Sequence, residues 1–166
     1  MTGDKIVITP LFALQAELDQ EIAASHHVDY ESTFSRRVLA LLVELGEFAN
    51  ETRCFKYWSF KEPSPKEVIL DEYADGLHFL LSLGIPLGVT EYTHYFHVEE
   101  KDLTKAIMKV YADVSDLHEH YDVDHYAKAF RDYLNIIPLF DYGEEEVLDA
   151  YVKKLSTNHK RQKEHY

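Results

Sequence analysis

Two acidic pairs with the same spacing are the residues of this sequence best suited to chemistry. Glu44 and Glu47 lie three positions apart in a largely apolar stretch, and Glu72 and Asp75 repeat that spacing. Residues three positions apart share one side of a helix, so each pair would present two carboxylates together. Two such pairs facing each other would need cations to balance their charge. An all-oxygen site of this kind suits Mg²⁺, with Mn²⁺ as an alternative.

Helices are expected to position these carboxylates. Apolar residues recur every three or four positions along most of the chain, and strict alternation is almost absent, which indicates amphipathic helices rather than strands. We therefore expect an all-α fold without strands, in which residues 1–166 form a single domain, a helical bundle with a four-helix core. The predicted helices begin just after Pro10 and then cover about 33–53, 64–84, 100–121, 123–135 and 144–166.

The segment between the two acidic pairs has the clearest boundary signals in the chain. Ser64-Pro65-Lys66-Glu67 matches a capping box with proline at the first helical position, and Gly84 stands where the same apolar pattern ends. Residues 55–65 have no helical period and would form a short loop between two antiparallel helices. Such a hairpin would bring all four carboxylates together, and Gly46 and Gly76 would let its helices approach closely.

Composition and charge exclude several classes of partner. The chain of 166 residues is 46% hydrophobic and carries a formal net charge of -13, which argues against binding nucleic acid or anionic lipid through a basic surface. Its single cysteine, Cys54, cannot form an internal disulfide. No signal peptide or membrane-spanning stretch is evident. We expect a soluble cytoplasmic protein that binds neither nucleic acid nor membranes.

Each acidic pair also has a simpler explanation. A lone Glu-x-x-Glu is common on the solvated surface of acidic proteins, so only the two pairs together favour a metal site. A di-iron carboxylate bundle is a distinct alternative, and Asp75-x-x-His78 supplies one imidazole, but the Glu-x-x-His motif that such bundles repeat on two helices is absent. A non-catalytic helical regulator is a third alternative, which the presence of all four carboxylates disfavours.

The combination of motifs resembles the dimeric dUTPases of the all-α nucleoside triphosphate pyrophosphohydrolase superfamily, which includes the MazG-type enzymes. The motifs are Glu44-x-x-Glu47, the loop Phe55-Lys56-Tyr57-Trp58, and Glu72-x-x-Asp75 followed by Gly76-Leu77-His78-Phe79. An early helix, LFALQAELD, supplies Gln15, where the family has a glutamine that contacts the base. The tail, YVKKLSTNHKRQKEHY, is similar to the C-terminal motif of the family and supplies Lys154, Asn158, Arg161, Gln162 and Tyr166.

The resemblance implies a homodimeric enzyme that uses Mg²⁺ to hydrolyse dUTP to dUMP and pyrophosphate. It implies that the metal ligands are Glu44, Glu47, Glu72 and Asp75, and that Glu44 or Glu47 also activates the attacking water. It further implies that substrate is bound by Gln15, Lys56, Trp58, Lys154, Asn158 and Arg161. Trp58 would form one wall of a pyrimidine pocket, close to Phe55 and Gln15.

Two positions depart from the family pattern. Asp19 stands where many dimeric dUTPases have asparagine, and an ionised carboxylate accepts hydrogen bonds but cannot donate them. Leu155 stands where the tail motif has asparagine. These departures leave open an alternative substrate preference, either for dCTP or for a broader set of deoxynucleoside triphosphates.

Overall fold

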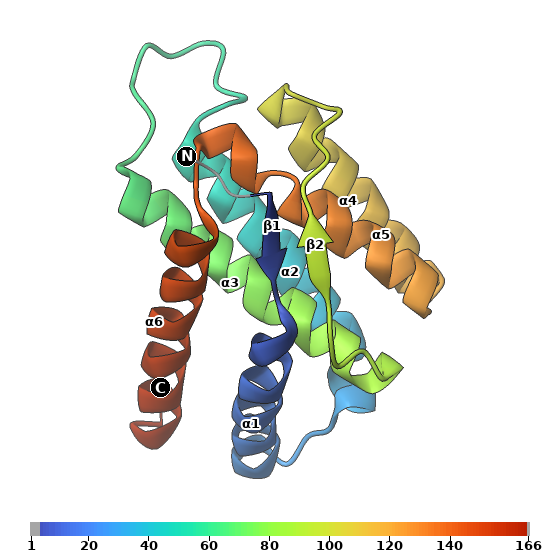
Figure 1. Ribbon diagram of the computed structural model, residues 1–166. Coiled ribbons are helices and arrows are strands. Elements are labelled where there is room, and N and C mark those ends of the chain that lie inside the picture. The colour runs from blue at the N-terminus through green and yellow to red at the C-terminus, as the bar shows by residue number, and fades with distance from the viewer. Residues whose placement is uncertain (1–3, 166) are drawn as a thin grey trace.

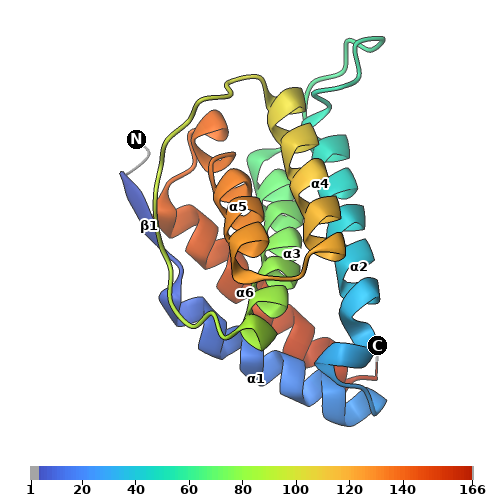
Figure 2. The ribbon, with the colours of Figure 1, turned by 90° about the vertical axis from the view of Figure 1, so that its right-hand side faces the viewer.

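Four antiparallel helices form the centre of the molecule in the computed structural model, which describes residues 4–165. Helices α2 (Tyr30–Thr52) and α3 (Lys66–Gly84) form a hairpin, and α4 (Leu103–Glu119) and α5 (Val123–Leu134) form a second hairpin beside it (Figures 1 and 2). This arrangement confirms the predicted all-α bundle with a four-helix core.

Two further helices cover α3 on the side away from α4. Helix α1 (Thr9–His26) and helix α6 (Glu144–Lys163) lie side by side and both contact α3 (Figure 2). Short 3₁₀ helices at Ile85–Leu87 and Ile137–Phe140 follow α3 and α5. Helix α3 is therefore the central helix of the described chain, surrounded by α1, α2, α5 and α6.

Buried apolar side chains from all six helices form one core. Leu45 and Phe48 of α2 and Leu77 and Leu81 of α3 belong to this core, and all four are at most 1% exposed. Burying one such side chain contributes about 1.5–3 kcal/mol, so the α2–α3 contact is a major source of stability. Among the described residues, no helix combines the length and apolar content needed to cross a membrane.

A small sheet is present that the sequence did not predict. Strands β1 (Lys5–Val7) and β2 (Thr93–Tyr95) pair in antiparallel fashion, with Ile6 opposite His94. The expectation of no strand was therefore wrong. Three residues are too few to establish an alternating pattern, and the pairing joins segments far apart in the sequence.

The predicted helix boundaries lie within three residues of the observed ones, but the cap expected before α3 is wrong. Pro65 is the N-cap residue of α3 and makes no side-chain cap hydrogen bond. The Ser64 hydroxyl instead donates to the carboxylate of Glu51 at the end of α2. Ser64 thus closes the loop between α2 and α3. Gly84 is the last residue of α3, as predicted.

The two glycines beside the acidic pairs have a different role from the one predicted. A β-carbon at Gly46 would lie 3.3 Å from the hydroxyl of Tyr111 on α4, and one at Gly76 would overlap the hydroxyl of Tyr133 on α5. These hydroxyls donate to backbone carbonyls of α2 and α3. The glycines therefore make room for tyrosines of the second hairpin, rather than for a close approach of α2 to α3.

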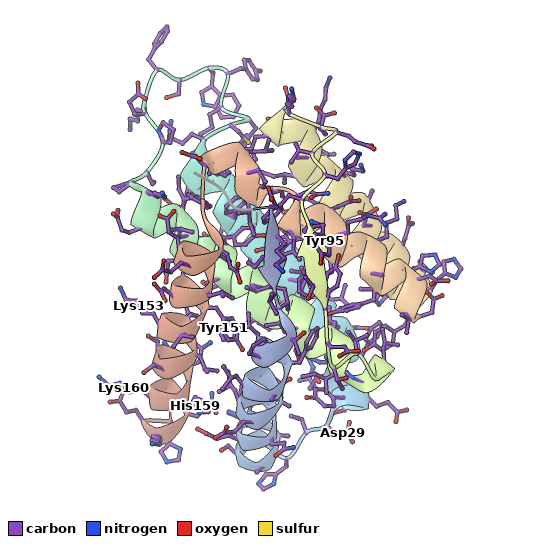
Figure 3. The ribbon with its side chains drawn as sticks, in the orientation of Figure 1. Asp29, Tyr95, Tyr151, Lys153, His159 and Lys160 are labelled. Atoms are coloured by element: carbon purple, nitrogen blue, oxygen red, sulfur yellow. The ribbon has the colours of Figure 1, made fainter. Side chains whose placement is uncertain are left out.

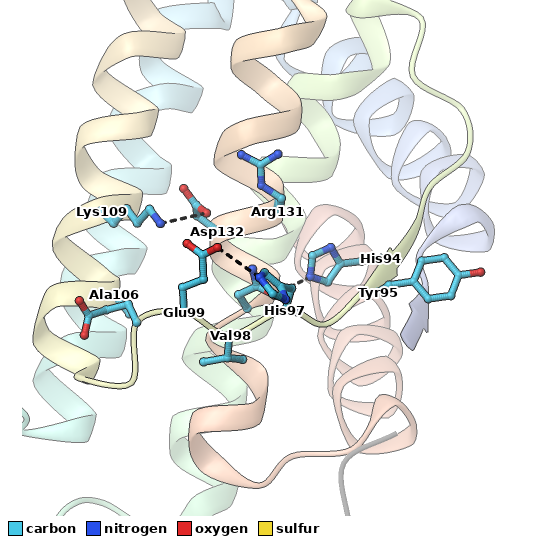
Figure 4. Close-up of a pocket in the computed structure, with 11 residues that line it drawn as sticks. His94, Tyr95, His97, Val98, Glu99, Ala106, Lys109, Arg131 and Asp132 are labelled. Atoms are coloured by element: carbon cyan, nitrogen blue, oxygen red, sulfur yellow. Dashed lines mark hydrogen bonds and ion pairs between the residues drawn. The ribbon is translucent and has the colours of Figure 1, made fainter. Parts of the chain in front are cut away.

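A buried carboxylate pair joins α4 to α5. Asp113 is 3% exposed and Asp132 is 8% exposed. Lys128 lies 3.5 Å from Asp113, and Lys109 lies 3.8 Å from Asp132 (Figure 4). The Oδ2 atoms of both aspartates have no other partner among the described residues. Burial, and then Asp132, raise the pKa of Asp113. The pair therefore favours a state that holds one proton.

Replacing Asp113 by asparagine should remove a pH dependence of stability. A carboxyl whose pKa is raised on folding binds its proton more tightly in the folded state, so wild-type unfolding free energy should fall as pH rises above about 4. The asparagine amide would donate a hydrogen bond to Asp132 without titrating. We expect the unfolding free energy of the variant to exceed that of wild type by about 1–2 kcal/mol at pH 8. Urea unfolding at pH 5, 6.5 and 8 measures this difference.

Asp116→Asn is the matched control, because Asp116 is exposed on the same helix. Its stability should follow the wild-type pH profile. If Asp113→Asn also followed that profile, Asp113 and Asp132 would not share a proton.

Candidate active site

The hairpin of α2 and α3 brings three of the four predicted metal ligands together. Carboxylate oxygens of Glu44, Glu72 and Asp75 all lie within 4.8 Å of one another. Glu44 comes from α2, and the other two residues come from successive turns of α3. Three oxygen donors at this spacing could hold a divalent cation between them.

Glu47 lies at the margin of this acidic cluster. Its charge contributes to raising the pKa of both Glu44 and Glu72, so its carboxylate is near them. It is, however, exposed and has no oxygen within the compact group. Glu47 could complete a metal site only by a change of side-chain rotamer.

The electrostatics of the cluster favour a bound cation. Burial, and then the charge of Asp75, raise the pKa of Glu44. Burial followed by the charges of Asp75 and Glu44 raises the pKa of Glu72 to about 7. A carboxyl group whose pKa is raised by burial and like charges is stabilised in its ionised form by a metal ion. The donor set, made only of carboxylates, therefore fits a hard divalent ion such as Mg²⁺.

Lys154 supplies one positive charge to this region from α6. Its Nζ atom lies 3.0 Å from Asp71 Oδ1 and 3.2 Å from Asp75 Oδ1, and its side chain is 8% exposed. The family resemblance implies that Lys154 binds substrate, whereas the structure places its ammonium group on carboxylates. Asp71 was not predicted, although it lies one helical turn before Asp75 and so shares its face.

A cavity of about 420 Å³ extends from the acidic cluster between α1, α2, α3 and α6. It runs along α2 from Tyr30 to Glu44, which corresponds to about 20 Å of helix. Three predicted substrate-binding residues line it, Gln15, Asn158 and Arg161. The structure therefore brings residues from both ends of the sequence to the predicted acidic site.

Gln15 lies in this cavity with both ends of its side-chain amide hydrogen-bonded. Its Nε2 atom donates to Asp19 Oδ1 at 3.0 Å. Its Oε1 atom lies 2.6 Å from His78 Nδ1 and accepts from the Tyr151 hydroxyl at 2.9 Å. Asp19 also accepts from the Tyr30 hydroxyl at 2.9 Å. Asp19, one of the two positions that depart from the family pattern, thus lies in the cavity, directly beside Gln15.

The loop between α2 and α3 does not reach this cavity. Neither Lys56 nor Trp58 lines it, and the loop projects beyond the end of the bundle opposite α1 (Figure 1). Trp58 packs edge-on against Phe55, with ring centroids 6.0 Å apart, and is 63% exposed. The predicted proximity of Trp58 to Phe55 is confirmed, and its proximity to Gln15 does not occur within one chain.

A second cavity, of about 330 Å³, lies beside β2 and α5 (Figure 4). Its lining mixes acids and bases, including Glu99, Lys109, Arg131 and Asp132. None of the predicted site residues contributes to it. The larger cavity is therefore the one that corresponds to the predicted active site.

The sequence profile of the dUTPase family matches residues 7–166, which is nearly the whole chain. The chain belongs to the dUTPase family. Among curated proteins, none matches it. Membership confirms the resemblance inferred from the motifs and makes the protein a hydrolase of the dUTP diphosphatase type. Enzymes of the dUTPase family use a divalent metal ion, for which Glu44, Glu72 and Asp75 form the matching cluster among the described residues.

One residue beside the site, Tyr151, was not revealed by the motifs. Tyr151, Lys154, Asn158 and Arg161 recur at intervals of three and four in α6, so they share one face of that helix. This spacing could have assigned Tyr151 to the site. Tyr166 of the tail motif lies outside the described residues.

Proposed function

We propose that the protein hydrolyses dUTP to dUMP and pyrophosphate with Mg²⁺ held by Glu44, Glu72 and Asp75, and with Glu47 as a fourth ligand. The observation that supports this most strongly is that one cavity joins a carboxylate cluster to Gln15. A nucleoside triphosphate matches this arrangement at both ends. Its phosphates need the cations that the carboxylates would hold, and its base needs hydrogen bonds of the kind that Gln15 offers.

The base would lie against Gln15 and Asp19. A Gln15 amide proton and an Asp19 carboxylate oxygen are adjacent in the cavity, so they offer a donor beside an acceptor. The O4 and N3–H groups of uracil present the complementary acceptor and donor. This pairing supports a pyrimidine substrate in the cavity.

The phosphates would lie toward Glu44 and Asp75. A bound Mg²⁺ ion would neutralise phosphate charge and stabilise the pyrophosphate leaving group. Arg161 and Asn158 line the same cavity and would contact phosphate oxygens. Lys154 would need only a small movement to contact a phosphate oxygen, because its ammonium group already lies beside Asp75.

A carboxylate of the cluster would activate the attacking water. Water adds to the α-phosphorus, the bond from that phosphorus to the bridging oxygen breaks, and the proton of the water passes to the carboxylate. Glu44 suits this role because burial raises its pKa toward the range of a useful base. Glu47 is the second residue that could act as the base.

We also propose that the active enzyme is a homodimer in which the Trp58 loop serves the cavity of the partner subunit. Trp58 and Phe60 of this loop are mainly exposed, as are Leu39 and Val43 on α2. Leu39 and Val43 lie next to the stripe that carries Glu44 and Glu47. A second copy covering this apolar face would bring its loop close to the acidic cluster.

Complementation between two impaired variants tests this arrangement. Trp58→Ala should weaken dUTP binding about tenfold through loss of base stacking, and Glu72→Gln should be inactive. Mixed dimers, isolated with two different affinity tags, should bind dUTP with wild-type affinity and show about half of the wild-type activity, because one of two sites is intact. Mixed dimers of Glu72→Gln with Asp75→Asn are the control and should stay inactive. Mixed dimers that kept the tenfold weaker dUTP binding of Trp58→Ala would place the loop in its own subunit's site.

The proposed function is tested by phosphate-product analysis with dUTP, dCTP, dTTP and UTP, each with Mg²⁺ and with chelator. We expect selective turnover of dUTP that requires Mg²⁺. Turnover of dCTP at an equal or higher rate would replace the proposed substrate, and absence of turnover with verified Mg²⁺ binding would reject the proposed reaction.

A further inference from the structure

The amide oxygen of Gln15 is contacted by two side chains that come from outside the predicted substrate-binding set. His78 lies on α3 and Tyr151 on α6, where it faces α1 (Figure 3). Their rings stack on each other, with centroids 4.2 Å apart and planes 21° apart. Both residues are buried, and so is Gln15, at 3% exposure. The three side chains therefore form one buried assembly that joins three helices.

These contacts fix which end of the Gln15 amide faces Asp19. An ionised Asp19 only accepts hydrogen bonds, so the Nε2 end of Gln15 must face it. The Oε1 end then accepts from the Tyr151 hydroxyl and from His78. Burial lowers the pKa of His78 to about 4, so its ring is neutral at physiological pH. Because Oε1 can only accept, the single ring proton must lie on Nδ1. All three contacts stabilise the same orientation of the amide.

This orientation determines what the cavity offers to a base. With Nε2 toward Asp19, an amide donor lies beside a carboxylate acceptor. With the amide turned over, two acceptors would be adjacent, which suits an exocyclic amino group but not the O4 and N3–H edge of uracil. The difference between these two arrangements is a difference in base preference.

We propose that Tyr151, together with His78, is a positioning residue that sets base selectivity by fixing the orientation of the Gln15 amide. This inference rests on the proposed function, because it concerns recognition of the base in the same cavity. Tyr151 itself does not line the cavity, so its effect passes through Gln15.

Tyr151→Phe tests the proposal, since it removes the hydroxyl and keeps the ring that stacks on His78. We expect KM for dUTP to rise about five- to tenfold, with kcat within about twofold of wild type. The ratio of kcat/KM for dUTP over dCTP should fall by a similar factor. Loss of structure alone would lower kcat/KM equally for both substrates and leave that ratio unchanged.

Two further variants make the test decisive. Tyr126→Phe removes another buried hydroxyl, which donates to the Leu80 carbonyl, and should leave the dUTP to dCTP ratio at the wild-type value. In a Gln15→Ala background, Tyr151→Phe should change the ratio no further, because its effect requires the amide. An unchanged ratio in Tyr151→Phe, or an equal change with and without Gln15, would overturn the proposal. If the wild type turned over neither nucleotide, the proposed function would fail instead.

Discussion

Replacing Glu72 by glutamine should abolish dUTP hydrolysis while raising the melting temperature of the metal-free protein. Removal of one oxygen ligand from a three-carboxylate cluster should lower kcat/KM by about 1,000-fold or more. Without metal, however, Glu72 is half-buried next to Asp75 and Glu44, and burial followed by those charges raises its pKa. A neutral amide relieves this repulsion, so we expect a gain of about 1 kcal/mol, or roughly 2–4 °C.

The two halves of this prediction are measured on the same samples. Initial rates with dUTP and Mg²⁺ give the activity, and thermal unfolding in chelator gives the stability. Glu67→Gln is the control, because Glu67 is exposed in the first turn of the same helix. It should keep full activity and be slightly less stable, since an acid there complements the helix dipole. A Glu72→Gln protein that lost stability would show that the cluster is not under electrostatic strain.

Mg²⁺ affinity should fall steeply with acidification, and chelation should remove activity altogether. The pKa of Glu72 is about 7 without metal, so below pH 7 a proton competes with the ion for this carboxylate. For one competing proton, the dissociation constant should rise about fivefold from pH 7 to pH 6, about tenfold from pH 8 to pH 6, and change little above pH 8. Titration calorimetry with Mg²⁺ at pH 6, 7 and 8 measures this dependence.

Glu72→Gln again provides the comparison, because its residual Mg²⁺ binding should lose most of the pH dependence. Equal wild-type affinity at pH 6 and pH 8 would indicate that Glu72 does not contact the ion. Addition of excess Mg²⁺ after chelation should restore dUTP hydrolysis, which separates loss of metal from loss of fold.

The helices were predictable because local patterns determine them. Helix α2, for example, buries Leu41, Leu45 and Phe48 on one face, and this spacing is visible in the sequence. Its start was predicted three residues late, because the side chain that caps it, Asp29, precedes the apolar pattern. The β1–β2 pair was not predictable in this way, since its stability depends on partners that are distant in the sequence.

The candidate site was predictable to the extent that it repeats local spacing. Glu44, Glu72 and Asp75 converge because a short loop makes α2 and α3 antiparallel. The position of Lys154 against Asp71 depends on how α6 packs on α3, which no local pattern specifies. The exposed location of Trp58 was not predictable for a similar reason, because a loop without helical periodicity has no sequence pattern that indicates the direction in which it projects.

Two tyrosines of α5 pack against glycines of α3 and fix the position of α3 along its axis. Tyr133 occupies the space left at Gly76, and Tyr126 occupies the space left at Gly84, two turns further along α3. Sliding α3 along α5 by even one residue would drive both rings into side chains. The helix that carries Glu72 and Asp75 is therefore held in axial register by its neighbour, so we expect this wall of the cavity to stay fixed when a nucleotide binds.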